Sequence, residues 1–284
     1  MAITTREARR PVALSTRAPA STPTKRRWTR FILPVYVAVV MLYLVLPILV
    51  MILYSFNESG VKKVSFRWLG FTTKWYGRVF VFADLTAALK NSLIVAVIST
   101  VIATILGTLV ALALVRYRFR GRGGVDFVLF MNISAPEIVL GASLLSLFIT
   151  FGVPRGLATI VVAHVMFNIA YVAITVRARL VGFDRAVEEA AQDLGAGPWT
   201  TFTRVTLPLI FPGVIAGALL AFVLSIDDFV ITNFNAGATQ TFPLWVYGAV
   251  KIGIPPQVFV MGTLIFMFGV ILAASNVVLQ RRKT

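Results

Sequence analysis

The stretch "RARLVGFDRAVEEAAQDLGAGPWTTFTRVTLPL", residues 177–209, separates two long apolar runs and is itself patterned as two short helices. Asp184 is placed to cap the first helix, because Asp is favoured at helix N-caps. Gly195 suits the left-handed position after the last turn, and Pro198 suits the first position of the second helix. Most loops of this length are plain connectors or disordered. These signals instead predict a small folded hairpin that offers a docking surface.

The chain around this hairpin is strongly apolar. Of its 284 residues, 58% are hydrophobic, against about 45–50% in an ordinary soluble domain. The excess falls in runs long enough to cross a bilayer, for which a helix needs about 20 residues. Six spans are predicted, at residues 31–56, 85–115, 125–151, 157–176, 209–234 and 258–279. The fold class is therefore predicted to be all-α, a polytopic membrane protein with six transmembrane helices.

The distribution of positive charge predicts the orientation of these spans. With the N-terminus placed inside, 19 of the 27 Lys and Arg residues fall on inner segments, as the positive-inside rule requires. Both termini are therefore expected in the cytoplasm. Residues 1–30 are basic and rich in Ala, Pro, Ser and Thr, which predicts a disordered cytoplasmic arm before a membrane domain at 31–284. Because the net charge of +16 follows the membrane topology, we expect lipid and not nucleic acid as its partner.

Several kinds of chemistry are excluded by composition. The chain has no Cys and a single His, which argues against disulfides, thiolate chemistry, His-rich metal sites and a His-based triad. No metal ligand and no catalytic residue is therefore assigned. His164 and Asn168 lie one helical turn apart and are predicted to form interhelical hydrogen bonds. The chain also lacks the Gly-rich phosphate loop of ATPases, so no cofactor is expected on it.

Two adjacent acids interrupt the fifth apolar run, "LLAFVLSIDDFVI" at residues 219–231. A carboxylate near the bilayer centre costs roughly 2.5–3.5 kcal/mol. Asp227 and Asp228 lie about 27 Å along the span, toward its outer end. Three interpretations stay open: both cap the helix end, one pairs with a partner charge, or at least one lines a cation path. Phe229 beside Asp228 adds an aromatic face that suits an ammonium group.

Glu137 is the other acid within an apolar run. Pro136 precedes it, which predicts a kink near mid-membrane, and broken helices at that depth border sites in transporters. The alternative is a Glu bonded to freed backbone groups or to Asn132. Tyr171 continues the helix face of His164 and is predicted to join the same wall.

Two further patterns indicate packing and anchoring. Small residues recur every fourth position in the second run, which predicts close helix packing; they are Ser99, Ala103, Gly107 and Ala111. Residues 235–257 contain Phe242, Trp245 and Tyr247, and aromatic residues of this kind are typical of membrane interfaces.

The segment "EAAQDLGAGPWTTFTRVTLP", residues 189–208, resembles the EAA signature of ATP-binding-cassette (ABC) importer permeases. Its Glu, both Ala, the Gly and the closing Leu-Pro match, and Val205 stands where Ile is usual. Four stretches resemble the spermidine and putrescine permeases of this group: "PEIVLG" (136–141), "YVAITVRARL" (171–180), "FDRAVEEAAQDLGA" (183–196) and "SIDDFVITNF" (225–234). The resemblance covers about residues 31–280.

This resemblance implies the type I ABC importer permease fold, with the loop at 177–208 seated in a cleft of a cytoplasmic ATPase. It implies an ATPase-docking set comprising Glu188, Glu189, Ala190, Ala191, Asp193 and Gly195. It also favours a substrate path comprising Asp227, Asp228, Phe229, Glu137 and Tyr171.

The resemblance further implies a non-enzymatic transport subunit in the bacterial inner membrane. Its expected partners are a second permease subunit, two ATPase subunits that hold ATP and Mg²⁺, an extracytoplasmic substrate-binding protein and a polyamine. An importer permease for another ligand, such as iron, thiamine or an opine, stays open, because the EAA signature concerns the ATPase and not the cargo. A secondary cation transporter and a membrane-embedded carboxylate enzyme are further alternatives.

Overall fold

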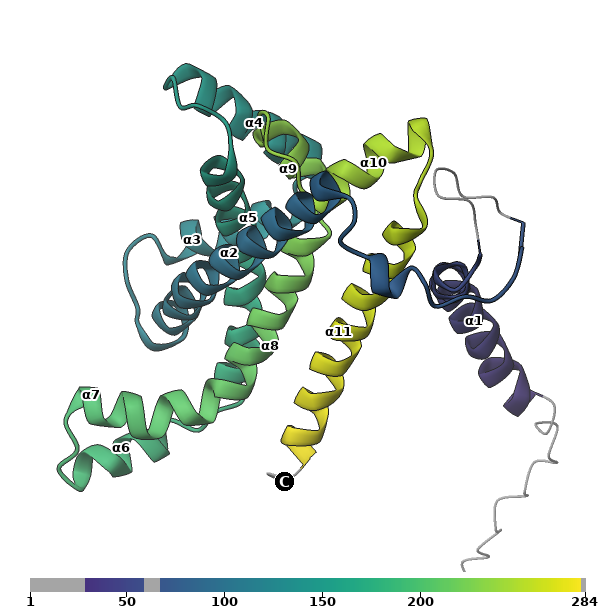
Figure 1. The fold of residues 1–284 in the computed structure, drawn as a ribbon. Helices are drawn as coiled ribbons and strands as arrows, with labels where there is room; N and C mark the ends of the chain where they lie inside the picture. The colour runs from purple at the N-terminus through teal and green to yellow at the C-terminus, as the bar shows by residue number, and fades with distance from the viewer. Residues whose placement is uncertain (1–28, 59–66, 282–284) are drawn as a thin grey trace, which may run out of the picture. The chain divides into compact units, whose positions relative to one another are not determined.

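The computed structural model describes residues 29–58 and 67–281, and this part of the chain is helical throughout apart from its connections (Figure 1). The all-α prediction is confirmed. The chain divides into two compact units, Met1–Leu49 and Val50–Thr284. Residues 1–28 of the predicted basic arm lie outside the described residues.

Four helices in the described ranges are long and apolar enough to cross a membrane. They are α1 (Thr29–Ser55), α2 (Ala83–Arg116), α5 (Leu157–Val181) and the continuous helix Pro198–Ile226, which comprises α7 (Pro198–Thr201), the π-helical turn η2 (Phe202–Thr206) and α8 (Leu207–Ile226). The remaining long helix is α11 (Pro256–Arg281). The prediction of a helical membrane protein is confirmed, and the number of six spans stays a prediction.

The predicted third span, at 125–151, is not one helix. α3 (Arg122–Ser134) and α4 (Glu137–Thr150) are bent by 110° at the break between them. Pro136 causes the break, because it has no N–H to donate and disfavours helical backbone at Ala135. Each half is about 20 Å long, shorter than the hydrocarbon core of about 30 Å. The predicted kink is confirmed. The prediction of one continuous span is wrong, because the two helices form a broken span or a re-entrant loop.

The predicted fifth span, at 209–234, is also interrupted. α8 ends at Ile226, and residues 227–229 belong to no helix before the short helix α9 (Val230–Asn235). At its other end the helix continues back into the hairpin, since α7, η2 and α8 follow one another without a gap. The hairpin is therefore a direct extension of a membrane helix.

α5 packs between α2 and α8, and Val172 of α5 lies against a glycine of each neighbouring helix. A Cβ added at Gly107 of α2 would lie 2.7 Å from the Val172 Cβ, and one at Gly217 of α8 would lie 3.3 Å from its Cγ1. No side chain larger than hydrogen fits at Gly107, so the glycine lets the two backbones approach. The predicted packing role of the small-residue stripe is confirmed, because all four of its members are buried.

The segment between α1 and α2 folds around two buried side chains. The Trp75 indole N–H donates to the carbonyl of Asn57 at 2.9 Å, and the Asn57 Oδ1 accepts from the Leu69 N–H at 2.9 Å. A single 3₁₀ turn, η1 (Tyr76–Arg78), follows Trp75. Trp75 joins α2 and α11 in one apolar cluster that also contains Val79, Leu85, Val258, Val260 and Met261.

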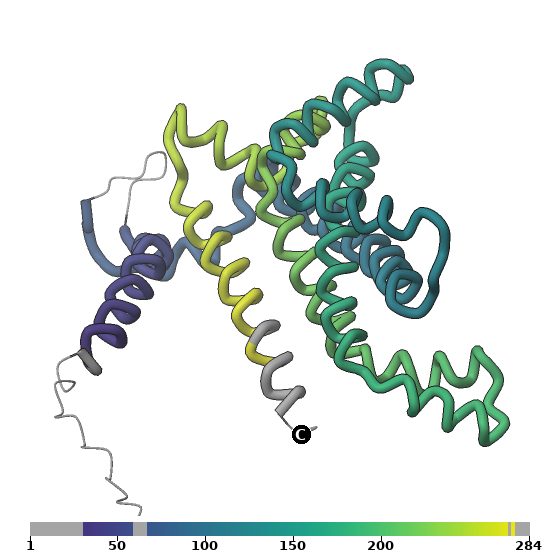
Figure 2. Tube along the Cα trace, turned by 180° about the vertical axis from the view of Figure 1, so that it is seen from behind, coloured from purple at the N-terminus to yellow at the C-terminus, as the bar shows by residue number. Residues whose placement is uncertain are grey.

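The hairpin consists of α6 (Ala186–Asp193) and α7, which lie beside each other and project beyond the ends of α5 and α8 (Figures 1 and 2). The Asp184 Oδ1 accepts from the Ala186 N–H at 2.9 Å. Gly195 has a φ of 88° and Pro198 occupies the start of α7. All three local predictions for this segment are confirmed.

A Gly107→Ala substitution tests the packing at Val172. The added methyl group overlaps Val172, and overpacking of this kind typically costs about 1–3 kcal/mol. We expect a lower thermal unfolding midpoint for the purified protein, and partial recovery when Val172→Ala is added. Gly248→Ala is the matched control, because nothing lies within 4 Å of a Cβ at that position. Equal midpoints for Gly107→Ala and the control would contradict the packing account.

Candidate functional site

The break between α8 and α9 separates the two adjacent acids. Asp228 turns inward, with 7% of its side chain exposed. Its Oδ2 accepts from the backbone N–H and from the hydroxyl of Thr232, each at 2.7 Å, and lies 3.2 Å from the Nε2 of His164. Asp228 therefore caps the start of α9 and is bonded to α5. The interpretation in which both acids cap the end of the span is wrong, because among the described residues the side-chain cap is made by Asp228 alone and at the start of α9.

His164 links Asp228 to three other helices. Its Nδ1 lies 2.6 Å from the Ser225 hydroxyl on α8, which lies 3.0 Å from the Ser99 hydroxyl on α2. The predicted interhelical hydrogen bonding of His164 is confirmed. Asn168 differs, because it is fully buried and neither polar atom of its side chain has a hydrogen-bond partner in the described part of the chain.

Asp227 turns the other way and is exposed. It lines a groove of about 450 Å³ together with aromatic residues of α10 (Phe242–Ile252), a helix that the sequence analysis did not predict. The rings of Phe229 and Tyr247 meet there with centroids 4.7 Å apart. An exposed carboxylate beside aromatic faces in an apolar groove suits an organic cation.

The Lys251 ammonium group lies over one ring of this pair, that of Tyr247. The Nζ of Lys251 lies 4.9 Å from the centre of the Tyr247 ring. The geometry is that of a cation–π contact, so this ring face accepts an ammonium group in the structure itself.

Glu137 is the first residue of α4 and is exposed, with no hydrogen bond or ion pair to any described residue. The predicted alternative bond to Asn132 is not formed, since Asn132 Nδ2 donates to the Met166 carbonyl at 3.1 Å. Leu140 of α4, three residues after Glu137, packs in one apolar cluster with Tyr171 of α5 and Ile231 of α9. The fold thus brings the predicted path residues into one region, although among the described residues no group of acids or histidines could hold a metal ion.

Sequence reasoning missed the contribution of α10. Phe242, Trp245 and Tyr247 were interpreted as interfacial anchors, but Phe242 and Tyr247 line the groove beside Asp227. Trp245 donates its indole N–H to the Asp84 Oδ2 at 2.8 Å, which ties α10 to the start of α2. The available signal was Pro243 at the start of the segment and Gly253 after it, which are typical of the two ends of a helix.

A second candidate site is the hairpin tip, at the opposite end of α8. Leu194 is 90% and Trp199 is 75% exposed, so large apolar side chains project where no described segment covers them. The Glu189 side chain is 66% exposed and lies 3.7 Å from Arg185. Of the other predicted docking residues, Ala190, Asp193 and Gly195 are exposed and Ala191 is half-buried. An exposed apolar tip beside an acid is the composition of a protein-docking surface.

Glu188 does not belong to this exposed set. Its side chain is 13% exposed, and its Oε1 lies 2.6 Å from both the Arg116 Nη2 and the Thr206 hydroxyl. Glu188 therefore faces the protein interior, although it is adjacent in sequence to an exposed acid.

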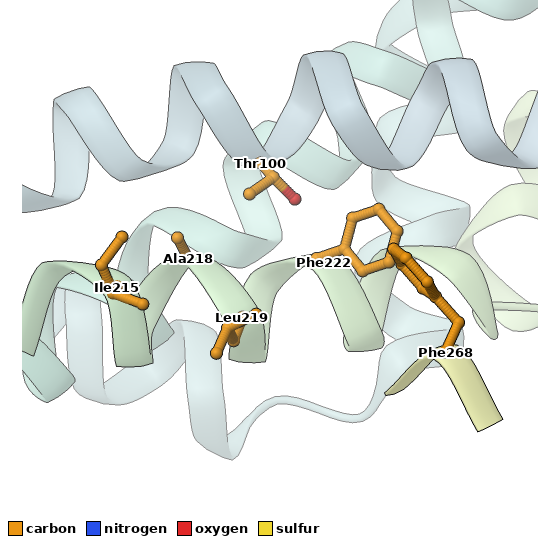
Figure 3. Close-up of a pocket in the computed structure, with 6 residues that line it drawn as sticks. All are labelled: Thr100, Ile215, Ala218, Leu219, Phe222 and Phe268. Carbon is orange, nitrogen blue, oxygen red and sulfur yellow. The ribbon is translucent and has the colours of Figure 1, made fainter. Parts of the chain in front are cut away.

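A third hollow, of about 220 Å³, lies between α2, α8 and α11 (Figure 3). Thr100 comes from α2, Phe268 from α11 and the other lining residues from α8, namely Ile215, Ala218, Leu219 and Phe222. Phe222 and Phe268 meet edge to face at 6.3 Å. Because its lining has one hydroxyl and no charged group, this hollow does not suit a cation.

Comparisons with known proteins agree with these features. The sequence pattern of the family described as "Binding-protein-dependent transport system inner membrane component" matches residues 103–284. The spermidine/putrescine transport system permease protein PotC of Escherichia coli (strain K12) is 39% identical over 243 residues, which cover 85% of this chain and 91% of that protein. The putrescine transport system permease protein PotI of the same organism is 41% identical over 231 residues, covering 78% and 81%.

Solved structures agree at the level of the fold. A chain from a bacterial ABC transporter involved in the import of the acidic polysaccharide alginate matches with a TM-score of 0.63 and 20% identity, over 93% of this chain and 100% of that chain. A second alginate transporter structure, in complex with a pentasaccharide-bound periplasmic protein, matches with a TM-score of 0.66 and 15% identity, over 92% and 96%. At these identities the likeness concerns the fold alone.

The two acids should differ in their effect on stability. Asp228→Asn replaces one of two acceptor oxygens with an NH2 group, so buried donors that face Asp228 lose an acceptor. Leaving a buried donor unmatched costs about 1–3 kcal/mol. Asp227→Asn alters an exposed group and should leave the thermal unfolding midpoint unchanged. Thermal unfolding of the purified variants measures both. An Asp227 variant that unfolds as early as the Asp228 variant would show that the two side chains do not have separate roles.

Proposed function

Because this chain belongs to the family of binding-protein-dependent transport system inner membrane components, we propose that it is the permease subunit of an ABC importer that moves polyamines into the cytoplasm. Membership of the family makes the chain a transport component of the membrane and not an enzyme. The cargo, the partner subunits and the residues of the path are the proposed parts.

The groove at Asp227 carries the proposal of a polyamine cargo. A polyamine is a flexible apolar chain with several ammonium groups. Asp227 supplies an exposed carboxylate, and Phe229 and Tyr247 supply adjoining aromatic faces. Such a groove favours an ammonium by charge and by cation–π contact, and methylene groups by apolar contact. The relatives named as spermidine and putrescine permeases support the same cargo.

The two acids have different roles in this proposal. Asp227 attracts the cargo, and Glu137 and Tyr171 extend the negative and aromatic wall, since Tyr171 shares an apolar cluster with the first turn of α4, which begins at Glu137. Asp228 holds α9 in place through Thr232 and His164 and does not contact the cargo. Without this support the segment that carries Phe229 would lose its fixed position.

The hairpin is proposed to dock on an ATPase. Leu194 and Trp199 supply apolar anchors, and the exposed Glu189 supplies a charge for a basic group of the partner. Since α7 continues into α8, a rotation of the ATPase moves the membrane helix directly. ATP and Mg²⁺ belong to that partner. Two ATPases, a second permease subunit and an extracytoplasmic binding protein complete the proposed importer.

The proposed orientation places the hairpin and both termini in the cytoplasm. The Lys and Arg distribution supports it, and docking on a cytoplasmic ATPase requires it for the hairpin. The Asp227 groove then lies near the outer surface of a bacterial inner membrane, because α8 separates it from the hairpin by about 30 Å. Cargo released from a binding protein outside would meet this groove early in its passage.

ATP hydrolysis by the reconstituted complex with its binding protein tests the cargo. The ligands are putrescine, spermidine, thiamine, ferric iron and a neutral sugar, each supplied singly. The proposal expects stimulation by the polyamines alone. Stimulation by a different ligand would refute the polyamine assignment and leave the family assignment intact.

Asp227→Asn should lower polyamine uptake in proteoliposomes by roughly tenfold, which corresponds to the loss of about 1.4 kcal/mol of attraction for the cargo. Asp227→Glu keeps the charge and should retain most of the uptake. Both variants should assemble with their partners as the unmodified chain does. Full uptake by Asp227→Asn at limiting substrate would remove Asp227 from the path.

Glu189→Lys should release the ATPase, because it places a positive charge against the basic group that the docking model requires. Co-purification of the ATPase with the membrane subunits measures this. Glu58→Lys is the matched control, since it makes the same charge change at an exposed site that pairs with Lys74 and lies outside the hairpin. A Glu189→Lys complex that keeps its ATPase and transports normally would contradict the docking role.

A further inference from the structure

Glu188 and Glu189 are adjacent acids with opposite environments. Glu189 is exposed on α6, and its ion-pair partner among the described residues is Arg185 at 3.7 Å. Glu188 is largely buried, and one of its carboxylate oxygens receives two short hydrogen bonds from other elements. A buried carboxylate with two internal partners is not available to a docking protein.

The two partners of Glu188 belong to different helices. Arg116 is the last residue of α2, its side chain is 13% exposed, and its guanidinium also lies 5.3 Å from the Phe183 ring. Thr206 closes the π-helical turn η2 and is buried. A single carboxylate therefore joins α2, α6 and the helix that leads into α8.

The π-helical turn is the joint between hairpin and membrane helix. Leu207 N–H donates to the Phe202 carbonyl five residues back, and Pro208, which follows, cannot donate at all. Turns of this kind are irregular and frequently occur at functional sites. The Thr206 hydroxyl fixes this joint to Glu188 at 2.6 Å, so the joint and α6 move together.

α2 reaches from this cluster to the cargo end of the molecule. Arg116 lies at one end of the helix, and Ser99, about 26 Å away along it, meets Ser225, which in turn lies 2.6 Å from His164. The hairpin is thus joined to the region of Asp228 by two routes. One is α8 itself, and the other is α2, whose last residue, Arg116, lies over the Phe183 ring just before α6 and forms the ion pair with Glu188 on α6.

We propose that Glu188 is a positioning residue that transmits hairpin movement to α2 through Arg116, and that it makes no contact with the ATPase. This inference rests on the proposed function, since it presumes an ATPase that moves the hairpin. It divides the acidic pair of the hairpin by role: Glu189 holds the partner, and Glu188 passes its movement into the membrane domain.

The test compares cargo moved with ATP hydrolysed in proteoliposomes that contain the whole complex. Glu188→Gln keeps the shape and removes the charge. We expect it to retain the ATPase and to hydrolyse ATP at close to the normal rate, while uptake per ATP falls by about 5-fold or more, the range of an ordinary coupling between sites. The charge-exchanged pair, Glu188→Arg with Arg116→Glu, should recover at least part of that loss.

Three results would overturn the proposal. Loss of the ATPase from the Glu188→Gln complex would assign Glu188 to docking, as for Glu189. Normal uptake per ATP would deny it any role in coupling. The third result is a fall in uptake that is matched by the fall in ATP hydrolysis and is accompanied by a lower thermal unfolding midpoint. Without recovery in the exchanged pair, this result would give Glu188 a structural role only. If the unmodified complex moves a different ligand, the polyamine proposal fails alone, and the same ratio measured with that ligand still decides the role of Glu188.

A distance measurement gives an independent readout. Because the chain has no Cys, spin labels attach only where Cys is introduced, at the exposed positions Gln192 on α6 and Leu109 on α2. With Glu188 in place the label distance should keep a narrow distribution with and without ATP. In Glu188→Gln it should broaden. An unchanged distribution in that variant would contradict the link.

Discussion

The contact on which the rest of the structure depends is the passage of α5 between α2 and α8 at Val172. Gly107 and Gly217 face this side chain from the two neighbouring helices, and their lack of a Cβ lets all three backbones approach. In lipid there is little hydrophobic gain from helix association, so close packing and buried hydrogen bonds must supply the stability. Once α5 is fixed there, His164 meets Ser225, and Ser99 follows from α2.

Two pairs of adjacent acids, Asp227–Asp228 and Glu188–Glu189, lie toward opposite ends of α8. In each pair one side chain faces inward and the other is exposed, and the helix packing accounts for this difference. At one end His164 and Thr232 hold Asp228 inward, and Asp227 is left facing the groove. At the other end Arg116 holds Glu188 inward, and Glu189 is left exposed. In both pairs the inward residue fixes the position of a neighbouring helix, and the outward residue is exposed to a ligand or partner. Glu188 and Glu189 are successive residues of α6 and so point about 100° apart, whereas Asp227 and Asp228 are separated by the break after α8.

Local signals in the sequence predicted the hairpin well. Asp184, Gly195 and Pro198 act within a few residues of themselves, so their caps and turns needed no knowledge of the remaining fold. The break at Pro136 was partly predictable, but its angle of 110° depends on the packing of α4 against α9 and not on the proline alone. The choice between Asp227 and Asp228 was not predictable, because it depends on His164, 64 positions away in sequence. The same holds for Glu188, whose partner Arg116 lies 72 positions away. Periodicity gives the face of a helix but not the helix that it meets.

The most direct test of the central claim is a structure of the assembled importer trapped with spermidine in its membrane path. The account predicts an ammonium group within ion-pair distance of the Asp227 carboxylate, with its methylene chain along Phe229 and Tyr247 and the Asp228–His164 pair intact behind them. A cargo bound away from Asp227, or one that displaces His164 to reach Asp228, would contradict the assignment of the groove as the polyamine path.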